Sequence, residues 1–270
     1  NKMSFMKQSK DKINIILITG MHRSGTSAMA GCFFNANYNF GNSDKEELTM
    51  SKKDNLKGHY ESHHFVRLSN SVLDSINTNW HFSINPKYCK QNGGNNECIN
   101  NGTVDYPIEN FNLTFHQDFS EMVVDCKMTL KENINDEDNN LVIKDPRASI
   151  ILPVYIRSII ERTNNYRLFI INMMRDDYDV SLSMNKRDGM PFDECREVIR
   201  KYRSLFDRYK KQTESHSLNE YIKFIDVSYE SLIDNPIKCL KNLEKTFNLD
   251  IIKNNEKKIL KFIDPDLKHF

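Results

Sequence analysis

The chain has 270 residues, of which 39% are hydrophobic and 28% are charged, and this is long enough for one sizeable α/β core. Its formal net charge of +1 gives no support for a nucleic-acid partner, and no polybasic run indicates an anionic membrane surface. No stretch approaches the roughly 20 consecutive apolar residues of a membrane helix, so no membrane segment is expected in this chain.

A glycine loop follows the first predicted strand, which covers residues 14–19. Gly20 and Gly25 keep the spacing of the nucleotide-binding loop G-x-x-x-x-G-K-[ST], but Thr26 stands at the lysine position and Arg23 lies three residues before it. Glycines let the backbone approach an anion closely, and N–H groups at a helix start favour negative charge. We therefore predict a phosphate site whose contacts come from Arg23, Ser24, Gly25, Thr26 and Ser27, with the N–H groups of residues 24–27 facing the ligand.

Cationic residues also follow two later strands. One short apolar strand delivers Lys144 just before a helix that starts with proline. A second, buried strand ends on Arg175, and Ser183 and Arg187 lie eight and twelve residues farther on. On a helix these offsets nearly align, so Ser183 and Arg187 share a face that points toward the Arg175 end of the strand. Two guanidiniums and a hydroxyl can clasp a second phosphate there.

Strands alternate with helices along the chain, which predicts an α/β fold: a P-loop-like parallel sheet with helices on both faces and ligands at the carboxyl ends of the strands. The predicted strands are 14–19, 141–144, 167–174 and 222–228. The predicted helices are 25–36, 61–76, 147–162, 177–187, 191–212 and 235–247. We expect one domain over residues 1–270, with a polar segment at 41–57 and an Asn/Gly-rich insertion near 83–118.

Both anion motifs resemble those of the sulfotransferases that use 3′-phosphoadenosine 5′-phosphosulfate (PAPS). Arg23 followed by Thr26 and Ser27 resembles the 5′-phosphosulfate loop of that superfamily. The later Arg–Ser–Arg set is similar to its 3′-phosphate site, most closely in the arginine-loop branch that includes tyrosylprotein sulfotransferases. The resemblance covers roughly residues 13–80 and 140–270 and leaves the insertion unmatched.

The resemblance implies roles for individual residues. Lys144, in a Lys-Asp-Pro segment, would neutralise charge on the transferring group, and Arg23 would stabilise it together with Lys144. Tyr229, in a Tyr-Glu-x-Leu segment after strand 222–228, would contact the nucleotide. PAPS would be the donor substrate. No metal would be needed, because arginine and lysine supply the counter-charge.

Members of the superfamily use a glutamate or a histidine after the first helix as the general base. Here Glu61 is the first candidate, since the Asn-x-x-Gly-x-x-Glu pattern that ends on it resembles bacterial carbohydrate-type sulfotransferases. His59 is the second candidate, and His63 and His64 lie close by in the sequence. The sequence leaves the choice between Glu61 and His59 open.

The function implied is transfer of a sulfuryl group from PAPS to an acceptor hydroxyl on a glycan or another hydroxylated small molecule. Two alternatives from other classes remain. A P-loop kinase of small molecules is disfavoured because Thr26 replaces the loop lysine. A non-catalytic nucleotide- or glycan-binding module would bind without turnover. The sequence does not identify the acceptor or the oligomeric state.

The six cysteines are scattered without metal-ligand spacing, which indicates reduced, partly buried thiols. Cys89 and Cys98 bracket a polar loop close to glycosylation-type triplets at Asn101 and Asn112, and these two thiols could pair in an oxidising compartment. The polar opening of the chain lacks a signal-peptide hydrophobic region, so we expect a cytoplasmic protein. Because the chain does not start with Met, an excised lumenal domain is the alternative.

Overall fold

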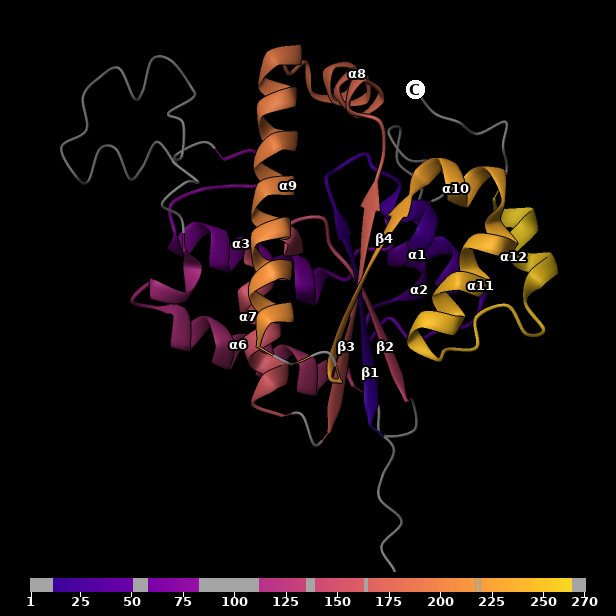
Figure 1. Ribbon diagram of the computed structural model, residues 1–270, viewed down its shortest axis with the longest axis horizontal. Coiled ribbons are helices and arrows are strands. Elements are labelled where there is room, and N and C mark those ends of the chain that lie inside the picture. Colours follow the sequence, from indigo (N-terminus) through magenta and orange to yellow (C-terminus); the bar gives the residue numbers. More distant parts are fainter. Residues whose placement is uncertain are drawn as a thin grey trace, which may run out of the picture.

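The structure is a computed structural model that describes residues 12–50, 58–82, 112–134, 139–162, 165–216, 218 and 220–263. In this part of the chain a four-stranded parallel sheet has the order β2-β1-β3-β4 (Figure 1). Its strands are β1 Ile13–Gly20, β2 Asn140–Lys144, β3 Tyr166–Met174 and β4 Ile222–Ser228. The predicted fold class is therefore confirmed, and each strand lies within one residue of its predicted bounds.

The central strand β1 is buried on both faces, as its unbroken run of apolar residues requires of a parallel strand. Successive side chains point to opposite faces, so Ile15 and Leu17 belong to one hydrophobic cluster and Ile16 and Ile18 to the other. The sheet therefore has two cores, one beneath each helical layer.

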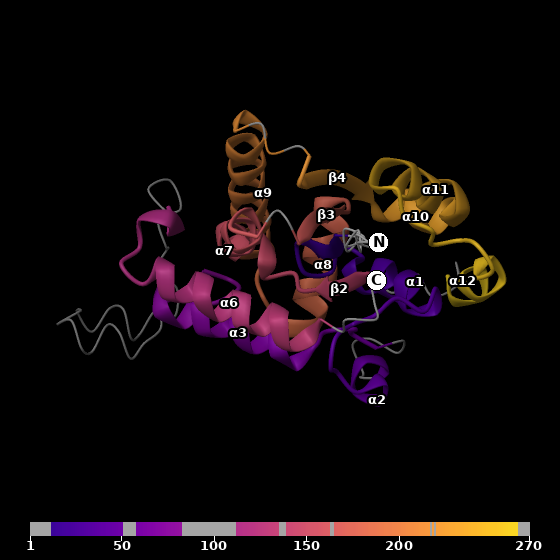
Figure 2. The ribbon, with the colours of Figure 1, turned by 90° about the horizontal axis from the view of Figure 1, so that it is seen from below.

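Helices cover both faces of the sheet (Figures 1 and 2). The layer beside the cluster of Ile15 and Leu17 contains α3 His63–Ser75, α6 Phe119–Asn133, α7 Ala148–Ile160, α8 Asp177–Asp188 and α9 Phe192–Ser215. The opposite layer contains α1 Thr26–Asn35, α10 Tyr229–Asp234, α11 Pro236–Phe247 and α12 Glu256–Phe262. Two shorter helices are α2 Lys45–Thr49 and the 3-10 helix η2 Leu113–Phe115.

Among the described residues, four α-helices were not predicted from the sequence, namely α2, α6, α10 and α12, and neither was the 3-10 helix η2. The sequence of α6 hides its period, because Val124 and Met128 are apolar yet 51% and 56% exposed, which blurs the apolar stripe. Helix α2 has only five residues and begins where Asp44 accepts a hydrogen bond from the N–H of Glu46. Helices α10 and α12 are likewise too short to show a periodic pattern.

Helix α7 is kinked within the span predicted for it. Ile151 has non-helical angles (φ −99°, ψ 16°), two residues before Pro153. Proline has no N–H to donate and its ring crowds the preceding turn, which accounts for the break.

Several of the sequence predictions concern residues outside the described part of the chain. Most of the insertion near 83–118, with Cys89, Cys98 and Asn101, lies outside the described residues, and so do residues 51–57 of the polar segment predicted at 41–57. Cys32, Cys126 and Cys195 are buried, as expected of thiols in a core. No helix in the described part of the chain combines the length and the apolar character that crossing a membrane requires.

Candidate active site

The loop after β1 has a shape that its two glycines make possible. Gly20 has φ +127°, and a Cβ there would lie 2.3 Å from the carbonyl oxygen of Met173 in β3. Gly25 has φ +95°, and a Cβ there would lie 2.4 Å from the ring of Tyr229. Neither position can carry a side chain without displacing its neighbour. Arg23 between them also has a left-handed backbone, with φ +68°.

The loop ends at the start of α1, where Gly25 is the N-cap and has no side chain to cap the helix. The first-turn N–H groups of a helix lack intrahelical partners, and the positive end of its dipole lies there. Thr26, Ser27 and Ala28 of this turn line a cleft of about 640 Å³ at the carboxyl ends of the strands. An anion in this cleft would meet the start of α1.

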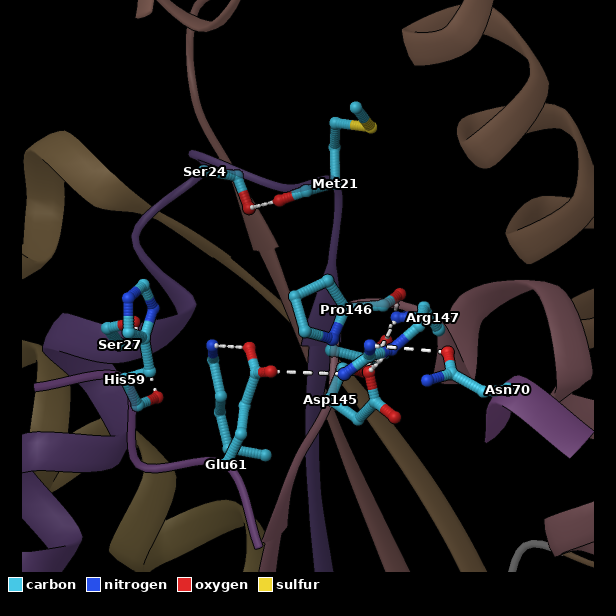
Figure 3. A network of polar contacts seen from close by, with 11 residues as sticks. Met21, Ser24, Ser27, His59, Glu61, Asn70, Asp145, Pro146 and Arg147 are labelled. Atoms are coloured by element: carbon cyan, nitrogen blue, oxygen red, sulfur yellow. Dashed lines mark hydrogen bonds and ion pairs between the residues drawn. The ribbon is translucent and has the colours of Figure 1, made fainter. Parts of the chain in front are cut away.

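Ser24 departs from the prediction that its N–H faces the ligand. Its N–H and its hydroxyl both donate to the carbonyl oxygen of Met21, at 3.2 Å and 2.6 Å (Figure 3). This side chain is 1% exposed and closes the turn of the loop. The Ser27 hydroxyl donates to the backbone oxygen of His59 at 3.4 Å, which joins the loop to the segment that carries Glu61.

Helix α8 begins and ends at clear signals, and these fix its register. The carboxylate of Asp176 accepts hydrogen bonds from the N–H groups of Tyr178 and Asp179, and Gly189 ends the helix in a left-handed conformation. This register places Ser183 and Arg187 on one face, as the offsets of eight and twelve predict.

The two predicted phosphate motifs meet in space. The Nε of Arg23 donates to the hydroxyl of Ser183 at 2.7 Å, although 160 residues separate them in sequence. The guanidinium of Arg175 lies 4.7 Å from the ring centre of Tyr229 and 3.4 Å from the carboxylate of Asp179. Arg187 contacts the adjacent Asp188 at 2.6 Å and lines the same cleft. Cationic side chains of the cleft are those of Arg23, Lys144, Arg175 and Arg187.

Glu61 lies between two cations (Figure 3). Its Oε1 is 2.5 Å from the Nζ of Lys144, and its Oε2 is 3.0 Å from a terminal nitrogen of Arg147. Burial by itself raises the pKa of Glu61, but the positive charges of Lys144 and Arg147 outweigh burial and lower this pKa to about 2. The carboxylate is therefore ionised throughout the physiological range of pH. The side chain of Lys144 is only 3% exposed and that of Glu61 is 22% exposed, so the lysine side of the pair is shielded from bulk water.

Two solved sulfotransferases resemble this structure over most of the chain. STF9 from Mycobacterium avium has 12% sequence identity and a TM-score of 0.52, covering 97% of this chain and 69% of its own. STF1 from Mycobacterium tuberculosis H37Rv has 12% identity and a TM-score of 0.52, covering 93% of this chain and 72% of its own. The chain has the sulfotransferase fold. No family model matches the sequence, and neither does any curated protein.

Within this sulfotransferase fold, the candidate general bases differ in the residues that they contact. Glu61 and His59 both line the cleft, and the described contact of His59 to the glycine loop is through its backbone oxygen. His63 lies 3.2 Å from the carboxylate of Glu47, and the ring of His64 packs against that of His63 at 3.9 Å. Glu61 is the candidate that the structure places in contact with Lys144.

Three residues of the site were missed in the sequence. His22 lines the cleft with its ring 4.6 Å from that of Trp80, and burial lowers its pKa well below the usual value, so the ring is neutral. Arg147 contacts Glu61, and Asp145 contacts Arg147. Asp145 and Arg147 could have been found from their place in the Lys-Asp-Pro-Arg segment, in which only the lysine was assigned a role from the sequence. For His22 the only signal was its position beside Arg23.

Among the described residues, no three His, Cys, Asp or Glu side chains gather in a way that could hold a metal ion. The positive charges that face the cleft are those of arginine and lysine, which suit a phosphate or sulfate group.

Proposed function

We propose that the protein is a PAPS-dependent sulfotransferase that acts on an acceptor hydroxyl of a glycan or another hydroxylated small molecule. The observation that carries the proposal is the contact of Arg23 with Ser183 beside the pair of Glu61 and Lys144. The contact joins the glycine loop, which we assign to the 5′-phosphosulfate, to the helix that we assign to the 3′-phosphate, and Glu61 lines the same cleft as Arg23. The sulfotransferase fold supports the same function.

The reaction would be an in-line transfer. The acceptor oxygen bonds to sulfur and passes its proton to Glu61, while the bond from sulfur to the bridging oxygen breaks and adenosine 3′,5′-bisphosphate leaves with the electron pair. Arg23, Lys144 and the first-turn N–H groups of α1 would stabilise the charge on the sulfuryl and bridging oxygens. Arg175, Ser183 and Arg187 would hold the 3′-phosphate, with Tyr229 beside the nucleotide.

Adenosine 3′,5′-bisphosphate is expected to raise the melting temperature without added metal, because its two phosphates bind the folded state only. At a ligand concentration about 100 times the dissociation constant the gain is about 2.7 kcal/mol, or roughly 5–10 °C for a chain of this size. AMP, which lacks the 3′-phosphate, should give a much smaller shift. Thermal unfolding with each nucleotide, with and without chelator, tests this. Equal shifts for the two nucleotides, or a shift that chelator removes, would argue against a PAPS site.

Replacing Arg175 by alanine is expected to weaken bisphosphate binding by roughly tenfold or more, the scale of a lost charge-assisted contact. Turnover at saturation should change little, because a 3′-phosphate contact is remote from sulfur and is made in both the ground and the transition state. Calorimetry and steady-state kinetics measure the two effects. Arg157→Ala, on the exposed side of α7, is the matched control. An unchanged affinity in Arg175→Ala would remove this arginine from the site.

The acceptor and the donor are tested together by a screen with labelled PAPS against carbohydrates and hydroxylated small molecules. Phosphate release from ATP and magnesium by the same preparation would instead favour a kinase. Binding of the bisphosphate without label transfer to any acceptor would favour the non-catalytic module.

A further inference from the structure

Arg147 is held by the buried carboxylate of Asp145. The backbone N–H and the Nε of Arg147 both donate to Oδ1 of Asp145, at 3.0 Å and 2.7 Å. Asp145 is completely buried, and the side chain of Arg147 is 11% exposed. A buried carboxylate needs such a partner, so Asp145 fixes the plane of the guanidinium.

The same guanidinium reaches two residues outside its own segment. One terminal nitrogen donates to Oε2 of Glu61 at 3.0 Å, and the other donates to Oδ1 of Asn70 in α3 at 3.4 Å (Figure 3). Arginine can make these contacts together because its donors form a rigid planar fork. Lysine, with one ammonium group, cannot reach Asp145 and Glu61 in the same geometry.

Glu61 thus has two unlike oxygens. Oε2 faces Arg147, which Asp145 anchors, whereas Oε1 faces Lys144, which lines the cleft. Under the proposed function Lys144 also serves the sulfuryl group, so Oε1 is the oxygen whose partner changes when the substrates bind. A carboxylate held only by Lys144 would be free to follow that lysine.

We infer that Arg147 is a positioning residue for the proposed base: anchored by Asp145, it fixes Oε2 of Glu61 so that Oε1 is the oxygen presented to the acceptor proton. This inference rests on the proposed function. The proton passes from the acceptor hydroxyl to Oε1 while Oε2 keeps its hydrogen bond to Arg147. The competing explanation is that Arg147 only fastens the start of α7 to α3, through Asn70.

Arg147→Lys separates these explanations, because it keeps a positive charge beside Asp145 and so avoids a buried unpaired carboxylate. The matched control is Arg157→Lys, which makes the same change at an exposed arginine of α7 that pairs with Glu161. We expect Arg147→Lys to lower turnover by roughly tenfold to a hundredfold, the scale of a misplaced catalytic group, and to leave bisphosphate affinity within about twofold. Arg157→Lys should change neither.

The decisive measurement is the same substitution in a Glu61→Gln background. A residue that acts through Glu61 has little further effect once the base is gone, so Glu61→Gln with Arg147→Lys should turn over within about twofold of Glu61→Gln alone. An equal loss in both backgrounds, or full turnover of Arg147→Lys, would overturn the inference while leaving the proposed function intact. Absence of transfer by the wild-type protein to any acceptor would overturn the proposed function first, and this inference with it.

Discussion

Replacing Arg23 by alanine is expected to slow sulfuryl transfer on the order of a hundredfold or more, with both substrates saturating. The guanidinium is a donor that the loop holds in place, through a left-handed backbone and a 2.7 Å hydrogen bond to Ser183. Such a donor acts mainly on charge that develops in the transition state, so the loss should appear in turnover. Lys144→Ala should have an effect of similar size, because this nearly buried lysine would meet the same charge.

Single-turnover kinetics with labelled donor measures these effects, and Arg157→Ala serves as the control for a surface arginine on the same fold. Circular dichroism and the bisphosphate-induced thermal shift should show that each variant is folded. The roles of Arg23 and Lys144 are tested independently of each other. Near-wild-type turnover in either alanine variant would show that the replaced residue does not stabilise the transition state.

Glu61→Gln is expected to lower turnover by about a hundredfold or more, within the usual range for loss of a general base, and to leave bisphosphate affinity nearly unchanged. The glutamine keeps the size of the side chain but cannot take the acceptor proton. His59→Ala is the comparison, since His59 lines the same cleft, and Glu161→Gln is the surface control. Full activity of Glu61→Gln beside an inactive His59→Ala would transfer the role to the histidine.

The pH dependence of kcat/KM distinguishes the two bases independently. Because the pKa of Glu61 in the free protein is lowered to about 2, the carboxylate stays ionised until the pH falls far below neutrality. A Glu61 base therefore gives no acidic limb between about pH 4 and 8, whereas an ordinary histidine gives one near about 6.5. The same shift affects stability: the ion pairs of Glu61 stabilise the fold above its unfolded pKa of about 4.3, and this contribution is lost as the pH falls toward 2.

The fold could be predicted because a parallel sheet leaves a plain signal in the sequence. Strands β1 and β3 each contain a run of four apolar residues, 15–18 and 168–171, and the loop at Gly20 and Gly25 marks the carboxyl end of the first strand. The spacing from Arg175 to Ser183 and Arg187 also predicted correctly that the last two share a helix face. That prediction assumed a helix after Arg175, and α8 is that helix.

The rest of the site depends on contacts that no local pattern specifies. The pairing of Arg147 with Glu61 joins residues 86 positions apart, and it exists only because the start of α7 packs beside the segment before α3. The hydroxyl of Ser24 looked like a ligand donor, but it turns inward to Met21 because the loop must satisfy its own carbonyl oxygen. The sequence left Glu61 and His59 as alternatives. Both line the cleft, and Glu61 is in contact with Lys144, so the choice between them rests on the variants and the pH profile described above.

The left-handed backbone of Arg23 means that the residue best for stability at this position differs from the residue that the proposed activity needs. An L-residue other than glycine in this conformation is less stable by roughly 1–2 kcal/mol, so glycine at position 23 would relax the loop. It would also delete the guanidinium that points into the cleft. Selection for a more stable protein without selection for turnover should therefore favour loss of this arginine, and a more stable variant with glycine there is expected to turn over about a hundredfold more slowly.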